Sequence, residues 1–223
     1  MSDPPTDPLQ QFAARIGGAE KPTLVEMLAF WKTYTISGAE SAEGFATLGR
    51  AFIQCDEHLI GHDVVHAGID LHKNDTRLRQ LHALALIHTG AIQRANAALI
   101  DLRREGHRDN QTLGMLGRTY KDLADEAASS EERRILLTRS YDTYFDAYLQ
   151  SKDSTQQSVT ERCWPGINAA TVALLAGKAE AAKKLAAEVR DECLPAAKPP
   201  DTEGSYWLLA TLGEAALILG IAA

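Results

Sequence analysis

The feature that most constrains this 223-residue chain is a repeat with a period of 34 residues. When segments that begin at Ala42, Thr76 and Asn110 are aligned, residues of similar size fall in the same columns. The columns are Leu48, His82 and Leu116; Gly49, Ala83 and Gly117; Phe52, Leu86 and Tyr120; Gly61 and Ala95; Val65 and Leu99. Small residues let two antiparallel helices approach closely, and large ones fill the space between neighbouring pairs. The pattern therefore predicts stacked helix pairs.

This alternation of large and small residues resembles the tetratricopeptide repeat, a helical hairpin that recurs every 34 residues. The resemblance implies an all-α, right-handed superhelix of antiparallel helix pairs. One hairpin cannot bury its apolar face alone, so the hairpins stack and form a curved surface that commonly binds another molecule. The fold favours a binding role, but it does not identify the ligand.

The repeat pattern also predicts how the chain is organised. We expect a disordered segment over residues 1–8, capping helices over 9–40, and repeats over 41–223. The repeats are predicted at 42–75, 76–109, 110–150, 163–194 and 205–223, the last one incomplete. In the third repeat the small residue expected after Tyr120 comes about eleven positions late, at Ser140. The inserted residues either lengthen both helices or form a polar loop.

The apolar character of the last predicted helix, Tyr206 to Leu219, points to contacts beyond its own hairpin. Two interpretations stay open: the chain is a fragment of a longer protein, or a partner or second copy covers this helix. We expect self-association through it, with Ile218 and Leu219 exposed. The residues assigned to this surface are Trp207, Leu208, Leu212, Ile218 and Leu219.

Composition excludes several classes of protein. A formal net charge of −7 argues against a nucleic-acid binder, which needs a basic face. The N-terminus lacks the pattern of a secretory signal, and no apolar stretch is long enough for a membrane span. Cys55, Cys163 and Cys193 form no CxxC pair, so we interpret them as unpaired thiols in a reducing cytoplasm.

Two segments carry a more specific resemblance. They are Trp-Pro-Gly-Ile-Asn-Ala-Ala-Thr at 164–171 and Tyr-Trp-Leu-Leu-Ala-Thr-Leu-Gly-Glu-Ala at 206–215. Both resemble the TRAFs-binding domain of the apoptosis-signal-regulating MAP kinase kinase kinases and its bacterial relatives, over about Leu48 to Gly220. The resemblance implies a regulatory module in signalling that controls a fused or partner effector. Kinase activity does not carry over, because the chain has no glycine-rich phosphate loop and no DFG motif.

Three histidines four residues apart, His58, His62 and His66, offer an alternative function. This spacing places neighbouring imidazoles on one helix face, where two of them can chelate a metal. A metal-binding enzyme or sensor is therefore the alternative to the interaction module. The competing interpretation is a partly exposed polar stripe.

The concave face of a tetratricopeptide stack is built from the first helix of each pair, which predicts a partner-binding groove. Its candidate residues are Arg50, Ile53, Arg77, Gln80, Leu84, Arg118 and Lys121. Four cations on one groove suit an acidic peptide or a C-terminal carboxylate, whereas a solvated face is the alternative.

Asn168 and Trp164 are interpreted as structural. We expect Asn168 to tie its helix to a neighbouring helix or loop, and Trp164 with Pro165 to begin a helix rather than bind a ligand. The leading interpretation is a non-catalytic protein-interaction and regulatory module that needs no cofactor.

Overall fold

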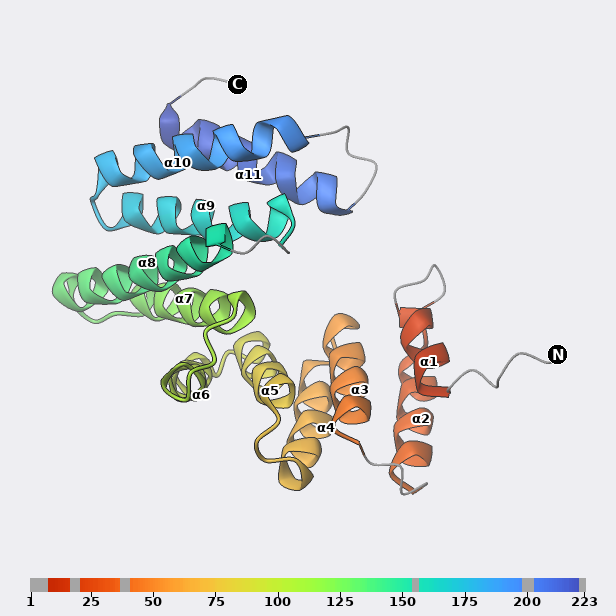
Figure 1. The fold of residues 1–223 in the computed structure, drawn as a ribbon. Helices are drawn as coiled ribbons and strands as arrows, with labels where there is room; N and C mark the ends of the chain where they lie inside the picture. Colours follow the sequence, from red (N-terminus) through yellow and green to blue (C-terminus); the bar gives the residue numbers. More distant parts are fainter. Residues whose placement is uncertain (1–7, 17–20, 37–40, 154–156, 198–202, 221–223) are drawn as a thin grey trace. The chain divides into compact units, whose positions relative to one another are not determined.

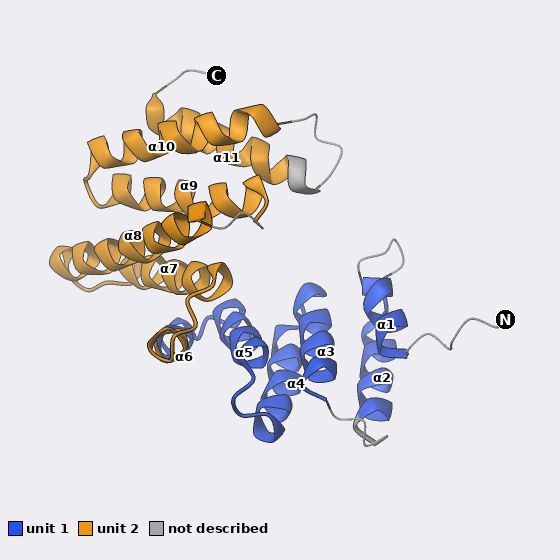
Figure 2. Cartoon of the chain, in the orientation of Figure 1, with its two compact units in different colours: residues 1–98 blue, residues 99–223 orange. Residues whose placement is uncertain are grey.

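The chain folds into helices throughout the part that the structure describes. The computed structural model describes residues 8–16, 21–36, 41–153, 157–197 and 203–220. Within these ranges it has eleven α-helices, one short 3-10 helix and no strand (Figure 1). The predicted all-α class is confirmed. The chain divides into two compact units, residues 1–98 and 99–223, and the boundary falls inside α6 (Ile92–Arg104) (Figure 2).

Unit 1 consists of the N-terminal helices and the start of α6. Its helices are α1 (Pro8–Ile16), α2 (Leu24–Ile36), α3 (Ala42–Gln54), α4 (His58–Leu71) and α5 (Thr76–His88). α3 packs against α4, and α4 packs against α5. Phe45, Phe52, Val65, Leu78 and Leu81 are buried in the core of this unit.

Unit 2 continues the helix pairs. After the end of α6 it contains α7 (Asn110–Asp125), α8 (Ser130–Asp153), α9 (Val159–Leu175), α10 (Ala179–Cys193), the 3-10 helix Leu194–Ala196, and α11 (Glu203–Leu219). Consecutive helices pack against one another, and α11 contacts both α9 and α10. Tyr144, Tyr148, Ile167 and Val189 lie in its core.

Helices α3, α5 and α7 begin at Ala42, Thr76 and Asn110, where the 34-residue alignment starts its segments. A capping residue stands just before each one: Ser41, Asp75 and Asp109. Their side chains accept hydrogen bonds from the backbone nitrogens of Gly44 (3.1 Å), Leu78 (2.8 Å) and Thr112 (3.1 Å). A cap satisfies backbone donors that the helix itself leaves unpaired, so the repeat register is encoded locally as well as by the core.

The small residues of the repeat allow close helix contacts, as predicted. A Cβ added at Gly61 would lie 2.7 Å from Cγ1 of Ile53, and one added at Gly117 would lie 2.8 Å from the ring of Tyr144. Ser140, the displaced small residue of the third repeat, donates a hydrogen bond of 2.7 Å to the carbonyl oxygen of Gly117. The α7–α8 approach is therefore fixed by steric fit and by a buried hydrogen bond.

The insertion of the third repeat lengthens both helices. α7 has 16 residues and α8 has 24, whereas α5 and α6 have 13 each. Of the two predicted alternatives, longer helices or a polar loop, the structure therefore shows longer helices. Gly90 and Gly177, which follow the ends of α5 and α9, have φ values of +79° and +76°, a conformation that favours glycine.

α11 folds back onto its own unit, and this corrects the prediction for the C-terminal surface. Leu208 and Ile218 are each 8% exposed, and Leu219 packs half-buried against the core. The expectation that Ile218 and Leu219 are exposed is wrong, because positions 208, 211, 215 and 218 form the helix face that meets α9 and α10. Self-association stays a prediction, and the apolar side chains available for it are Tyr206, Trp207, Leu209 and Leu217.

Candidate functional site

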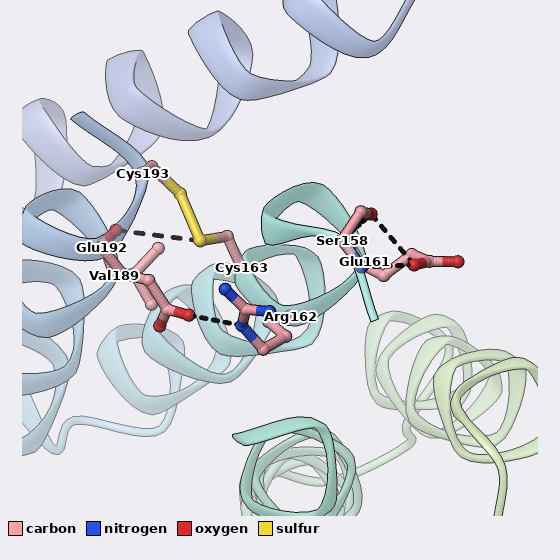
Figure 3. The surroundings of a disulfide bond; sticks show 7 residues. All are labelled: Ser158, Glu161, Arg162, Cys163, Val189, Glu192 and Cys193. Atoms are coloured by element: carbon pink, nitrogen blue, oxygen red, sulfur yellow. Dashed lines mark hydrogen bonds and ion pairs between the residues drawn. A yellow bond between two sulfur atoms is a disulfide. The ribbon is translucent and has the colours of Figure 1, made fainter. Parts of the chain in front are cut away.

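The first turn of α9 is held by a reciprocal cap. The hydroxyl oxygen of Ser158 accepts from the backbone nitrogen of Glu161 (3.2 Å), and Oε2 of Glu161 accepts from the backbone nitrogen of Ser158 (2.8 Å) (Figure 3). α9 therefore begins at Val159, not at Trp164. The prediction that Trp164 and Pro165 start a helix is wrong, because the Ser-x-x-Glu pattern that begins six residues before Trp164, at Ser158, supplies the stronger start.

Pro165 consequently lies inside α9, where it leaves a backbone acceptor without its helical donor. Proline has no N–H, so the carbonyl oxygen of Glu161, four residues earlier, loses its usual partner. Nδ2 of Asn110, the first residue of α7, donates to this oxygen at 3.3 Å and to Oε1 of Gln157 at 3.2 Å. Asn110 thereby joins the start of α7 to the start of α9.

Trp164 packs over α7 because residue 114 is glycine. A Cβ at Gly114 would overlap the six-membered ring of Trp164. The indole also meets the ring of Tyr144 edge to face, with centroids 6.0 Å apart. Trp164 nevertheless remains 37% exposed. Part of its indole is thus anchored, and part is free to contact a ligand.

These contacts border a cavity of about 370 Å³. Its walls come from α7, α9, the residue Gln157 before α9, and α11, so the cavity lies among the first helices of three successive pairs. The lining residues are Asn110, Gln111, Gln157, Thr160, Glu161, Trp164, Trp207 and Thr211. Ligand pockets commonly measure about 300–1,000 Å³ and combine apolar walls with a few polar groups. This cavity fits both criteria.

Glu161 is the one charged residue among the described residues that line the cavity. The hydrogen bonds from the backbone N–H and then the hydroxyl of Ser158 lower the pKa of its carboxyl group. At the N-terminus of α7, Oδ1 of Asp109 accepts from the backbone nitrogens of Gln111 (3.0 Å) and Thr112 (3.1 Å). Carboxylate side chains therefore cap both helix starts beside the cavity.

Two of the predicted groove residues, Arg118 and Lys121, lie further along α7. Nε of Arg118 pairs with Asp122 at 3.5 Å, and Lys121 is half-buried. On α9 and α11, the hydroxyl of Thr171 donates a short hydrogen bond to Glu214. This part of unit 2 thus carries carboxylates as well as cations.

The other five predicted groove residues belong to unit 1. Ile53 and Gln80 are buried, and Leu84 packs half-buried against the core. Nη1 of Arg77 pairs with Glu43 at 2.6 Å. Arg50 is half-buried, and burial followed by the charge of Arg77 lowers its pKa. An acidic partner for this groove stays a prediction.

The predicted histidine stripe divides into two groups within unit 1. Nε2 of His62 lies 3.2 Å from Nε2 of His82 on α5, and the rings of His62 and His66 are 5.9 Å apart. His58 instead stacks on His88, with ring centroids 4.4 Å apart. Across the described residues, no group of three or more His, Cys, Asp or Glu side chains is arranged to hold a metal ion. The metal alternative therefore gains no support.

A disulfide joins Cys163 near the start of α9 to Cys193 at the end of α10 (Figure 3). The two Cα atoms are 6.7 Å apart, and both side chains are fully buried. The interpretation of these cysteines as unpaired thiols is corrected, whereas Cys55 is free. Two helices that pack antiparallel bring the residues together despite their separation in sequence. Because disulfides are rare in the cytosol, this bond does not favour a cytoplasmic location.

Sequence reasoning missed most of the cavity. It named Trp207 only for self-association, and it treated Trp164 as a packing residue. It also expected Asn168 to tie neighbouring elements together, but Nδ2 of Asn168 donates to the carbonyl oxygen of Trp164 in its own helix (2.9 Å). The Ser158–Glu161 capping pattern was the available signal, since it predicts an earlier helix start and a proline inside the helix.

Comparison with known families identifies the class of protein. Residues 62–174 match the model of the family described as Tetratricopeptide Repeats-Sensor, which covers half of the chain. The chain belongs to this family. The matched segment contains six of the eight cavity-lining residues and ends before Trp207 and Thr211. No curated protein matches the chain significantly. Among the described helices, none has the length and apolar character needed to cross a membrane.

Proposed function

We propose that this chain is a non-catalytic interaction and regulatory module that binds a peptide segment of a partner protein in the cavity of unit 2. Peptide binding there controls an effector, either fused to the module or carried by the partner. Tetratricopeptide-type repeats generally mediate protein–protein interactions, and the sensor family is built from such repeats. The resemblance to the TRAFs-binding domain supports the signalling context.

The observation that carries this proposal is the pair of exposed tryptophans in one cavity. Trp164 is 37% exposed and Trp207 is 48% exposed, and both line the same space. Tryptophan combines a large apolar surface with few rotatable bonds, so it is enriched among residues that dominate binding energy. Gly114 and Tyr144 support the Trp164 ring, which reduces the entropy lost on binding.

A non-catalytic role is supported by the use of the tripeptide His107-Arg108-Asp109, which has the letters of a kinase catalytic-loop motif. Arg108 pairs with Asp146 on α8 at 3.0 Å. Asp109 caps α7. Both charged side chains thus serve the helix framework.

Selection from a random peptide library displayed on phage tests the proposal. The intact chain is immobilised, and selected peptides are measured against Trp207→Ala and against Leu217→Ala, an exposed apolar residue of the same helix outside the cavity. We expect peptides whose binding is lost with Trp207→Ala and kept with Leu217→Ala. Selected peptides that bind both variants equally, or no selected peptide at all, would contradict the proposed function.

A further inference from the structure

We infer that the cavity of unit 2 accepts a planar cation, the guanidinium group of an arginine side chain in the partner peptide. This inference rests on the proposed function and specifies the chemistry that the site recognises. Three observations support it: the aromatic walls, the hydrogen-bonding groups left in the lining, and the charge around it.

The aromatic walls suit a flat cation. Trp164 and Trp207 come from different helices and are both exposed within the cavity lining. A guanidinium group is planar and weakly hydrated, and it stacks on indole faces through cation–π attraction. Trp164 is already held in place over Gly114, so one stacking surface is formed before a ligand arrives.

Among the described lining residues, Glu161 and Asn110 each keep an acceptor oxygen that a cation can use. The backbone nitrogen and the hydroxyl of Ser158 both donate hydrogen bonds to Oε2 of Glu161. Figure 3 shows the other carboxylate oxygen of Glu161 directed away from Ser158. The amide nitrogen of Asn110 is committed to Gln157 and to the carbonyl oxygen of Glu161, which leaves Oδ1 as its available group. Guanidinium offers five N–H donors and no acceptor, so it complements this set.

Charge around the cavity favours a cation over an anion. Helix N-termini normally attract anions, and α7 and α9 both begin here. Asp109 and Glu161, however, place their own carboxylates at these two starts. The arginines next to the caps are also engaged: Arg108 pairs with Asp146 at 3.0 Å, and Arg162 pairs with Glu192 at 2.7 Å.

The experiment compares three small probes by nuclear magnetic resonance of the intact chain. N-acetyl-arginine amide carries the guanidinium, N-acetyl-citrulline amide is its neutral isostere, and N-acetyl-glutamate amide is an anion. The indole N–H signals of Trp164 and Trp207 report on the cavity, and that of Trp31 in unit 1 is an internal control. We expect the arginine probe to shift both cavity signals in a saturable way, with affinity about tenfold above that of citrulline.

Glu161→Gln should reduce the arginine affinity by about tenfold, because it removes the carboxylate that pairs with the cation. Glu180→Gln, in the exposed first turn of α10 and outside the cavity, should leave it unchanged. Equal binding of citrulline, preference for the glutamate probe, or no shift of either cavity signal would overturn the inference. In those cases Trp207-dependent peptides from the phage library would still support the proposed function, so the two failures are distinguishable.

Discussion

Asn110 and Glu161 are joined by a hydrogen bond of 3.3 Å from the side-chain amide of Asn110 to the backbone oxygen of Glu161. The bond exists because Pro165 cannot donate to that oxygen. It connects the first residue of α7 to the first turn of α9, and both residues line the cavity. The proline of the Trp-Pro-Gly segment thus creates an acceptor that an adjacent hairpin uses.

This relationship predicts non-additive effects of mutation. Asn110→Ala should lower the free energy of unfolding by about 1 kcal/mol, a typical net value for one hydrogen bond. In a Pro165→Ala background the same substitution should cost less than about half as much, because the restored N–H of residue 165 satisfies Glu161. Urea denaturation of the four variants of this double-mutant cycle measures the difference. A cost that is equal in both backgrounds would show that the proline does not create the acceptor.

Gly114 should be necessary for the position of Trp164. Gly114→Ala adds a methyl group that overlaps the indole, so it should lower stability by about 1–3 kcal/mol and shift the tryptophan fluorescence. Gly213→Ala is the matched control, since it lies within α11 with nothing within 4 Å of the added Cβ. We expect Gly213→Ala to be neutral or to stabilise by up to about 1 kcal/mol. The same loss of stability in both variants would point to a general effect of alanine rather than to the indole contact.

The sequence predicts the fold in detail where local and long-range signals agree. At Ala42, Thr76 and Asn110 the capping residues and the repeat columns indicate the same helix starts, and the structure places them there. At α9 the signals conflict, because Trp164-Pro165 resembles a helix start while Ser158 and Glu161 form the actual cap.

The cavity itself was beyond prediction. Trp164 and Trp207 are far apart in the sequence, and each also suits a packing role. Their presence in one cavity depends on the packing of α11 against α9, a tertiary contact that periodicity does not encode. The Cys163–Cys193 disulfide could not be predicted for the same reason, because it depends on how α9 packs against α10.

Stability should fall on acidification because of the histidine group in unit 1. Burial, followed by the charges of His62, His66 and Arg94, lowers the pKa of His82 to about 4 from 6.5. Between these values the unfolded chain binds a proton that the folded chain does not, so the free energy of unfolding decreases as pH falls. The full shift corresponds to about 3 kcal/mol, and partial solvent exposure reduces the expected loss to about 1–2 kcal/mol.

The measurement is urea denaturation at several pH values between about 7 and 4.5. His82→Gln should reduce the loss of stability across this range. The carboxylates of Asp63 and Asp70 lie 3.1 Å and 3.5 Å from ring nitrogens of His62 and His66, the histidines beside His82. His107→Gln, outside the group, should leave the pH dependence unchanged. An unaltered dependence in His82→Gln would rule out His82 as its source.

Alkylation under non-reducing, denaturing conditions should modify Cys55 alone, because Cys163 and Cys193 are bonded to each other. Reduction before alkylation should expose all three thiols to the reagent. Replacing both cysteines by serine should lower the free energy of unfolding by about 2–4 kcal/mol, the usual effect of removing such a cross-link. Mass spectrometry that finds three modified cysteines without reductant would contradict the disulfide.

The most direct test of the account is the dissociation constant of a library-selected peptide for the wild-type chain and for Trp207→Ala, measured by calorimetry. The cavity model predicts a dissociation constant at least about tenfold larger for Trp207→Ala than for the wild type, because an exposed indole that anchors a ligand contributes at least about 1.4 kcal/mol to binding. The Leu217→Ala control should bind as the wild type does. Equal dissociation constants for wild type and Trp207→Ala would contradict the assignment of this cavity as the binding site.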